Sequence, residues 1–455
     1  MAIKNQIYNH MKTIRTSLLI TGFLILMTGI SVNAQNKVWT LDECINYALS
    51  KNIQVQKTFL TNDRNQLTAT QAQANRLPSL NASANENFSW SKAFDYNTGL
   101  YGSANGSNST NFSMSSSVSL FNGQKLTNRI KQAQIDLESG KYNSEAVKES
   151  VSLSILNAYL QLLYNYESVT NAEKQIESTT EQLNLAKERM DIGVISMSDY
   201  LQIKSQLASE KSTLATAQSQ LAMSKVTLMQ LMELPVEPNF EISQPNLENL
   251  LVNSPDPSSQ EIYNLALGIK PQIKNAELSK ESAQIAVDIA KADGLPSLTM
   301  NGGLSTSYSS LSKDIAFTTQ VKEKLSPSVG VSMSIPIFQK KQIRTNIASA
   351  NITVADAELT EINTRNELRK NIEQACADVV SAKSQYAASL DQNQSAKESY
   401  EVATEKYNQS LINSVDYLIQ KTNQITSESK LLQSKFKLIF SYKIVDFYKG
   451  VPLAL

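Results

Sequence analysis

The sequence predicts a mainly α-helical protein that carries membrane β-strands and is built from two tandem structural repeats. Two observations predict this fold. Short motifs recur along the chain at a nearly constant offset, and each copy combines a very long proline-free stretch with two short segments that alternate between apolar and small polar residues. We expect the long stretches to form coiled-coil helices and the alternating segments to supply four strands per chain.

The repeat is visible in pairs of motifs. Leu77-Pro78-Ser79-Leu80 returns as Leu295-Pro296-Ser297-Leu298, an offset of 218, and Asp199-Tyr200-Leu201 returns as Asp416-Tyr417-Leu418, an offset of 217. Chance matches would scatter, whereas so small a drift is typical of an old tandem duplication.

Residues 1–34 are predicted to be a secretory signal peptide that is cleaved after about Ala34. Three basic residues precede an apolar run of about 14 residues, and Val32-Asn33-Ala34 forms a small-x-small cleavage signature. The alternative is an uncleaved anchor helix, but the run is shorter than the roughly 20 residues that span a bilayer.

The composition excludes several classes of function. The only histidine, His10, lies in the signal peptide, so the mature chain has no imidazole for acid–base catalysis or for most zinc sites. We find no paired catalytic carboxylates, phosphate loop or metal-ligand cluster, and we expect neither an enzyme nor a cofactor. The mature chain has 39 basic residues (42 minus three) against 42 acidic ones, a balance that argues against nucleic-acid binding.

The two cysteines, Cys44 and Cys376, lie in helical patterns far apart in the chain. We predict that both are small buried helix residues and not partners in a disulfide. Leu41-Asp42-Glu43-Cys44 superficially resembles a lipoprotein signal, but it is charged and lies beyond the apolar run. We therefore expect no lipidation.

Each repeat has the same order of predicted parts. Repeat one, residues 35–232, holds a helix at 40–76, strands at about 79–90 and 111–121, a long helix at 124–190 and a return helix at 198–232. Repeat two, residues 260–455, holds a helix, strands at about 297–308 and 328–338, a long helix at 339–407 and a return helix at 416–449. The linker at 233–259 contains five of the eleven prolines and is either a small collar or a disordered connector.

The four strands have the length and pattern of outer-membrane strands, each with one apolar and one small polar face. Trp90 and Tyr308 fall near equivalent strand ends, as in an interfacial aromatic belt, whereas Glu86 on the apolar face argues against lipid contact. A soluble, half-buried sheet would alternate similarly. Four membrane strands cannot close a barrel, so the chain would have to oligomerise, with eight strands in a dimer or twelve in a trimer.

The long helices are too long to fold into a globule. At about 1.5 Å per residue, residues 124–190 would reach roughly 100 Å. The first return helix has a seven-residue row of leucines, typical of a coiled-coil seam, at Leu207, Leu214, Leu221 and Leu228. The remaining surface is polar, as expected for the wall of a water-filled tube.

The order of these parts resembles the TolC family of outer-membrane efflux proteins over essentially the whole mature chain. The motifs that carry the resemblance are Leu41-Asp42-Glu43-Cys44-Ile45 with Ala48-Leu49, Leu77-Pro78-Ser79-Leu80, Leu120-Phe121-Asn122-Gly123, Ile335-Pro336-Ile337-Phe338, and Gly193-Val194-Ile195-Ser196 before Asp199. The resemblance implies a homotrimer with a twelve-stranded β-barrel in outer-membrane lipid and a helical α-barrel across the periplasm. It also implies a passive duct, joined by a periplasmic adaptor (membrane fusion protein) to an inner-membrane pump of the RND or ABC type.

The resemblance further implies a gate at the periplasmic helix turns. Asp416 matches a constriction aspartate, and Asp199 with Tyr407 matches members of a network that ties the helix pairs together. Ile419 and Ile412 depart from the pattern, because some relatives have a second acidic ring and an arginine at these places. A cap at a helix start is the alternative role of both aspartates. We expect a less acidic entrance that is held shut partly by apolar contact.

The turns themselves are the expected adaptor contacts. The residues assigned to this role are Gly193, Ile195, Ser196, Met197, Ser410, Leu411 and Asn413. Simple hydrophobic closure of each turn would explain the apolar members equally well. The alternative function for the whole chain is a periplasmic coiled-coil structural or adaptor protein without a membrane pore.

Overall fold

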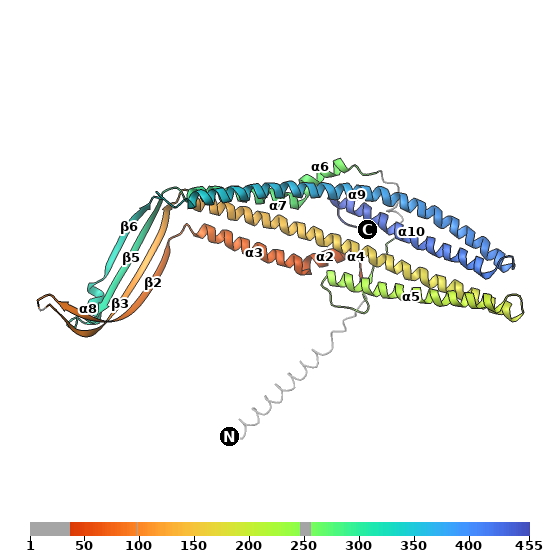
Figure 1. Cartoon of the computed structure of the whole chain (residues 1–455), viewed down its shortest axis with the longest axis horizontal. Helices are drawn as coiled ribbons and strands as arrows, with labels where there is room; N and C mark the ends of the chain where they lie inside the picture. The colour runs from red at the N-terminus through yellow and green to blue at the C-terminus, as the bar shows by residue number, and fades with distance from the viewer. Residues whose placement is uncertain (1–36, 98, 246–255) are drawn as a thin grey trace, which may run out of the picture.

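The computed structural model describes residues 37–97, 99–245 and 256–455, so the predicted signal peptide and its cleavage site lie outside the described residues. A sheet of four strands occupies one end of the elongated molecule, and long helices run from it to the other end (Figure 1). The predicted fold class of long helices, four strands and two tandem repeats is confirmed.

Two helix pairs of equal length make up the half of the molecule that is remote from the sheet, and the longer helix of each pair begins next to the sheet. α4 (Lys125–Asp191) and α9 (Gln342–Asn408) have 67 residues each, and both ends are offset by 217. α5 (Met197–Leu231) packs back along α4, and α10 (Ser414–Tyr448) packs back along α9. The return helices begin one or two residues earlier than the sequence predicts.

The shorter helix of each repeat is broken in two, which the sequence analysis missed. α2 (Leu41–Lys51) is separated from α3 (Ile53–Ala74) by Asn52, whose side chain caps α3 and donates to the carbonyl of Leu231 at 3.0 Å. α6 (Ser259–Ile269) and α7 (Pro271–Ala292) meet at the equivalent position, Lys270. The breaks arise because Asn52 satisfies free amides of α3, and because Pro271 has no amide to extend α6.

The sheet has the strand order β2-β3-β5-β6, and all neighbours are antiparallel. Its strands are β2 (Ser79–Asp95), β3 (Leu100–Phe121), β5 (Ser297–Ser309) and β6 (Ser326–Ser334). One face carries apolar rows such as Ala82–Met114–Leu304, and on the other face Ser83 and Ser113 hydrogen-bond at 2.7 Å. Glu86 is accommodated on the apolar face, because Asn108 and Thr110 donate to its carboxylate.

The first hairpin is longer than predicted. Pairing continues from Trp90↔Gly106 to Asp95↔Leu100, where the sequence predicts a loop. This stretch is rich in Ser, Asn and Gly, so it shows no apolar alternation, although backbone pairing needs none. In repeat two the corresponding connection contains α8 (Phe317–Glu323), whose buried Gln320 donates to the carbonyl of Ile315 at 2.9 Å.

Part of the proline-rich linker forms a small collar, which we call the linker collar. β4 (Glu241–Ile242) pairs in parallel with β1 (Val38–Trp39), and Trp39, Phe240 and Ile242 pack into the main core on α4. Residues 246–255 of the linker lie outside the described part of the chain. The thiol of Cys44 is fully buried in this core, where burial raises its pKa to about 12.

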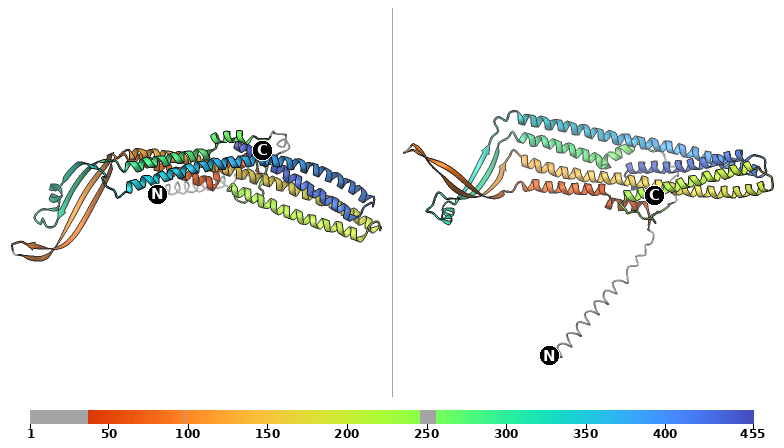
Figure 2. Two further views of the ribbon diagram at one scale, coloured as in Figure 1. Left: turned by 45° about the horizontal axis from the view of Figure 1, so that its top comes forward. Right: turned by 60° about the horizontal axis from the view of Figure 1, so that its bottom comes forward.

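Four helices lie side by side between the sheet and the linker collar, in the order α3, α4, α7 and α9 (Figures 1 and 2). The two outer helices expose apolar residues at seven-residue intervals: Ile53, Leu60 and Leu67 on α3, and Ile352 and Leu359 on α9. Leu60 and Leu67 are 68% and 70% exposed. None of the helices in the described ranges is both apolar and long enough to span a bilayer.

Candidate functional site at the helix tips

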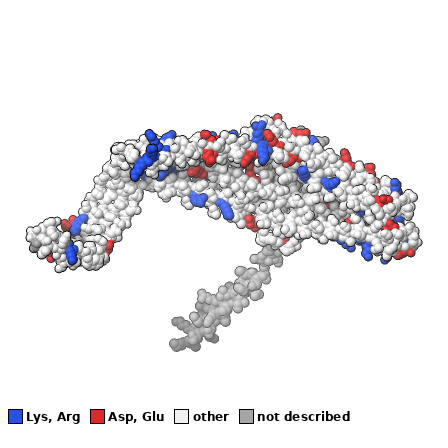
Figure 3. Space-filling model, in the orientation of Figure 1, with Lys and Arg blue, Asp and Glu red and all other residues white. Residues whose placement is uncertain are grey.

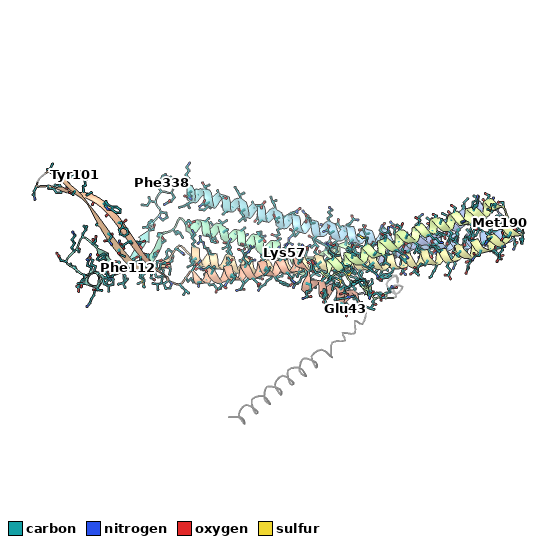
Figure 4. All side chains as sticks on the ribbon, turned by 90° about the horizontal axis from the view of Figure 1, so that it is seen from below. Glu43, Lys57, Tyr101, Phe112, Met190 and Phe338 are labelled. Carbon is teal, nitrogen blue, oxygen red and sulfur yellow. The ribbon has the colours of Figure 1, made fainter. Side chains whose placement is uncertain are left out.

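The turns between α4 and α5 and between α9 and α10 lie next to each other at the end remote from the sheet (Figure 2). Met190, next to the end of α4, marks this end, and Tyr101 in the first hairpin marks the opposite one (Figure 4). All the predicted gate and adaptor residues belong to this tip.

The two turns have the same backbone. Gly193 and its repeat equivalent Ser410 both adopt left-handed conformations, with φ values of 78° and 59°. Each turn ends at a capped helix, because Ser196 accepts from the amide of Asp199 at 3.1 Å and Asn413 accepts from the amide of Asp416 at 2.8 Å. Met197 and Leu411 are exposed beside these caps.

Asp199 links the two helix pairs. Its carboxylate completes a capping box with Ser196 and also accepts a hydrogen bond from the hydroxyl of Ser414, the first residue of α10. The hydroxyl of Ser414 and then that of Ser196 hold the pKa of Asp199 below its ordinary value, because both stabilise the ionised form. Capping and inter-pair linkage are therefore performed by the same side chain.

An aromatic cluster closes the tip beneath the turns. Tyr407 stacks on Tyr417 with ring centroids 4.8 Å apart, and the Tyr417 and Tyr400 hydroxyls lie 3.1 Å apart. Ile195 and Ile412 pack against this cluster. The buried hydroxyl of Tyr407 has no hydrogen-bond partner within the described residues, so the structure shows no bond between Tyr407 and Asp199. Burial and, second, the charge of Asp199 raise the pKa of Tyr407.

Arg189, in the last turn of α4, makes the second connection between the pairs. Its guanidinium donates to the carbonyls of Tyr407 and Asn408 at 3.2 and 2.9 Å. Both carbonyls belong to the last turn of α9, where regular intrahelical bonding ends. The Tyr407 carbonyl also accepts from the amide of Ser410 at 3.0 Å, just beyond the helix. A basic side chain there also complements the negative end of the helix dipole.

A buried ion pair lies farther from the tip. Lys421 of α10 faces Glu210 of α5 at 3.8 Å, with side-chain exposures of 3% and 6%. The hydroxyl of Thr179 on α4 contacts both charged groups, and Gln206 donates to Glu210 at 2.9 Å. Three helices from both repeats thus meet at one desolvated charge pair.

Asp416 and Ile419 are not part of these links. Both are exposed on α10 and line a hollow of about 680 Å³ between α9 and α10, together with Ile412, Val402 and Lys406. Ile412 therefore contacts the aromatic cluster on one side and the hollow on the other.

The sequence analysis missed Arg189, Ser414, Glu210, Lys421 and Thr179. Two signals could have found some of them. Arg189 has a basic repeat equivalent in Lys406, 217 residues on. Buried seven-residue rows contain Thr179 and Glu210, namely Asn165, Ala172, Thr179 and Ala186 on α4, and Ile203, Glu210, Ala217 and Ser224 on α5.

Comparison with known proteins identifies the family. The sequence model of the outer membrane efflux protein family matches residues 44–233 and 262–438, which covers most of both repeats. This chain belongs to the outer membrane efflux protein family. Its members are transport proteins of the outer membrane, and membership favours the channel over the pore-free periplasmic alternative.

Two relatives of this outer membrane efflux protein match most of its length at low identity. The outer membrane protein TolC of Escherichia coli (strain K12) is 24% identical over 372 residues, which cover 76% of this chain and 71% of TolC. The outer membrane efflux protein BepC of Brucella suis biovar 1 (strain 1330) is 20% identical over 329 residues, covering 72% of this chain and 69% of BepC.

Solved structures share the fold of this efflux protein. A CusC crystal structure, described in terms of transmembrane channel formation, superposes with a TM-score of 0.79 at 18% identity, covering 91% of this chain and 92% of CusC. The open state of the MtrE outer membrane channel of Neisseria gonorrhoeae superposes with a TM-score of 0.74 at 19% identity, covering 94% of each chain.

The buried ion pair should behave differently from an exposed one. Glu210→Gln leaves the Lys421 ammonium buried without a counter-charge, so we expect a loss of about 3–5 kcal/mol in the free energy of unfolding. Glu210→Gln combined with Lys421→Met should recover most of that loss. The exposed pair Arg369–Glu373 provides the control, and Glu373→Gln should cost less than about 1 kcal/mol. Equal losses for Glu210→Gln and Glu373→Gln in denaturation would contradict this assignment.

The Asp199 link should give the tip a defined acid sensitivity. Because the folded pKa of Asp199 is lowered, its stabilisation is present above the ordinary aspartate pKa of about 4 and is lost as the pH falls through the folded value. Ser414→Ala should bring this pKa back toward its ordinary value, so the tip should loosen at a higher pH. Channel current recorded against pH measures this, with Thr422→Ala, which removes an exposed hydroxyl of the same helix, as the control. Superimposable pH profiles for the two variants would rule out the Asp199 link.

Proposed function

We propose that three copies of this chain close into one export duct, a twelve-stranded barrel in the outer membrane continued by a helical tunnel in the periplasm. The unpaired outer edges of the protomer carry this proposal. β2 and β6 each have only one neighbour in the sheet, and an open strand edge in lipid leaves costly unpaired amides. Three copies, the number implied by the resemblance, pair every edge.

The helical layer supports the same head-to-tail closure. α3 and α9 are its outer helices, and each exposes apolar residues at seven-residue spacing, the pattern of a coiled-coil seam that lacks its partner. Different surfaces at the two edges favour a ring over a two-fold dimer, because α9 of one copy then packs on α3 of the next.

The repeat provides a template for this contact. Within the protomer, α4 of repeat one packs on α7 of repeat two, and β3 pairs with β5. The repeat equivalents of α4 and α7 are α9 and α3, and those of β3 and β5 are β6 and β2. The contact between the two repeats of one chain therefore supports an equivalent contact between adjacent copies.

The gate in this proposal is the tip. Asp416 would form an acidic ring around the threefold axis, which favours cations, and Ile419 and Ile412 would narrow the same opening by apolar contact. Opening would separate α9 and α10 from α4 and α5 at Asp199, Tyr407 and Arg189.

The exposed turns are the proposed contact for a periplasmic adaptor, which would connect the duct to an inner-membrane pump of the RND or ABC type. Ile195, Met197 and Leu411 supply apolar contacts, with Gly193, Ser196, Ser410 and Asn413 beside them. The tip would face the periplasm after cleavage of the signal peptide at about Ala34. Burial of Cys44 supports the absence of a lipid anchor there.

Ion conduction tests the function. Purified trimers in a planar bilayer should give small, cation-selective currents, and Asp416→Ala should reduce that selectivity or enlarge the openings. Asp391→Ala removes an acidic residue of α9 about 25 Å from the tip and should leave both unchanged. Absence of current from folded trimers would overturn the duct. If Asp416→Ala changes neither the selectivity nor the openings, the gate would be assigned to Ile412 and Ile419 instead.

Cysteine cross-linking tests the head-to-tail contact. Ser115 pairs with Gly303 inside the protomer, and the repeat offsets (115 + 217 and 303 − 218) convert this pair to Ser332 and Asn85 of adjacent copies. Ser332→Cys combined with Asn85→Cys should oxidise to a covalent trimer on a denaturing gel. Ser332→Cys with Ser89→Cys, shifted by four residues, should not. Efficient linkage of only the shifted pair would refute this register.

A further inference from the structure

Exposed basic residues gather where the strands meet the helices. Arg76 follows α3, Arg129 lies near the start of α4, and Lys340, Lys341 and Arg344 surround the start of α9. Basic side chains are visible over this junction, next to the largely uncharged strands (Figure 3). None of these five residues, which we call the junction collar, forms an ion pair within the described ranges.

The opposite end of the sheet has no such excess of positive charge. Acidic and basic residues alternate there, as in Lys313-Asp314 and Lys322-Glu323-Lys324. The excess of positive charge is therefore confined to the helix side of the sheet.

Repeat two holds this charge at the cost of backbone strain. Lys340 adopts a left-handed conformation with a φ of 49°, whereas the left-handed φ of Lys341, 66°, is shared by its uncharged equivalent. Their repeat equivalents are Gly123 and Gln124, and the equivalent of Arg344 is Thr127. A lysine in place of a glycine at positive φ is unfavourable for folding, and such outliers persist where function requires them.

Four of the five residues of the junction collar, all except Arg129 on the inner helix α4, also lie at the seam between copies in the proposed trimer, on which this inference rests. Inside the protomer, Lys125 pairs with Asp293 at this level. The repeat equivalents of that pair are Gln342 and Asn75, which are uncharged. Arg76 and the three basic residues around the start of α9 would therefore meet there without the acidic partner that Lys125 has inside the protomer.

The seam should be wider between copies than within one. A side chain at Gly123 would place its Cβ 2.8 Å from Leu295, so a lysine at the equivalent position requires more space. Exposed apolar residues, Ile335, Ile337 and Phe338, directly precede the collar. Phe338 lies at the junction of strand and helix (Figure 4). Apolar side chains followed by basic ones are typical of a chain that leaves the hydrocarbon layer through the headgroups.

We propose that the junction collar binds the anionic phosphate headgroups of phospholipids in the leaflet that faces the helices. Arginine matches phosphate oxygens with paired donors, and lysine adds unpaired positive charge. Basic clusters immediately outside a membrane segment attract anionic lipids. Bound headgroups would neutralise the collar and join adjacent copies at the level where the barrel meets the tunnel.

Lipid binding to the purified trimer tests the proposal. The collar variant Lys340→Gly/Lys341→Gln/Arg344→Thr installs the residues of repeat one, which fit the left-handed backbone. The control variant Lys92→Gln/Lys313→Gln/Lys322→Gln removes the same charge at the other end of the sheet. Phosphatidylglycerol, phosphatidylcholine and glycerol 1-phosphate are titrated into protein in neutral detergent. Retained lipid is measured by native mass spectrometry, and the thermal unfolding midpoint is recorded.

We expect phosphatidylglycerol to bind the wild type and the control, to raise their unfolding midpoints, and to bind the collar variant at least about tenfold more weakly. Equal binding to the collar variant would overturn the proposal, as would equal binding of phosphatidylcholine. Equal stabilisation by glycerol 1-phosphate would assign the site to free phosphate and not to lipid. Should the collar variant be less stable without lipid, Arg344→Thr alone provides the same comparison. Failure to form trimers or to conduct ions would refute the proposed function, whereas a conducting trimer with unchanged lipid binding refutes only this inference.

Discussion

A four-stranded sheet with an apolar outer face cannot end in lipid, because its edge amides would have no partners there. β2 and β6 present such edges in this chain, and the helical layer has the same problem in the apolar rows of α3 and α9. Most other features follow from this constraint. The sheet and the helical layer both lack partners at their two edges. These unpartnered surfaces and the length of the helices fit a chain that becomes complete only in a ring.

In the proposed ring, tandem duplication lets the same type of contact serve both within one chain and between copies. The two repeats differ where their seams have different surroundings. Asn52 anchors one helix break through the carbonyl of Leu231, whereas its equivalent, Lys270, is buried against Glu149 at 3.2 Å and lies over the ring of Phe447. Burial lowers the pKa of Lys270, an effect that the charge of Glu149 opposes. The junction collar would follow the same pattern in the proposed trimer, with unpaired charge between copies and the Lys125–Asp293 ion pair within each chain.

The sequence was sufficient to predict the elements whose signals depend on period or composition. α4 and α9 were predictable because the absence of proline over 67 residues admits little else. The extension of the first hairpin beyond Trp90 was not, because backbone pairing left no side-chain pattern. At the tip, the turns were predictable from the repeat, and the role of Asp199 only from the resemblance to the TolC family. The partner of Asp199 was not, because Ser414 lies 215 residues away and only folding brings them together.

The tip joins the helix pairs at two levels with different physical character. Near the turns, the links are a partly exposed carboxylate–hydroxyl bond at Asp199 and the contacts of Arg189 with the end of α9. Water can replace such partners, so these links are weak individually. Deeper in the bundle, separating Lys421 from Glu210 would leave two charges desolvated until water enters. The resemblance implies an arginine in some relatives where this chain has Ile412, so the outer level would have one less cation. In the proposed gate, the buried pair would then be the costliest contact to separate. In the proposed gate, the resistance to opening would therefore lie largely at this pair, with Glu210 11 residues along α5 from Asp199 and Lys421 five residues along α10 from Asp416.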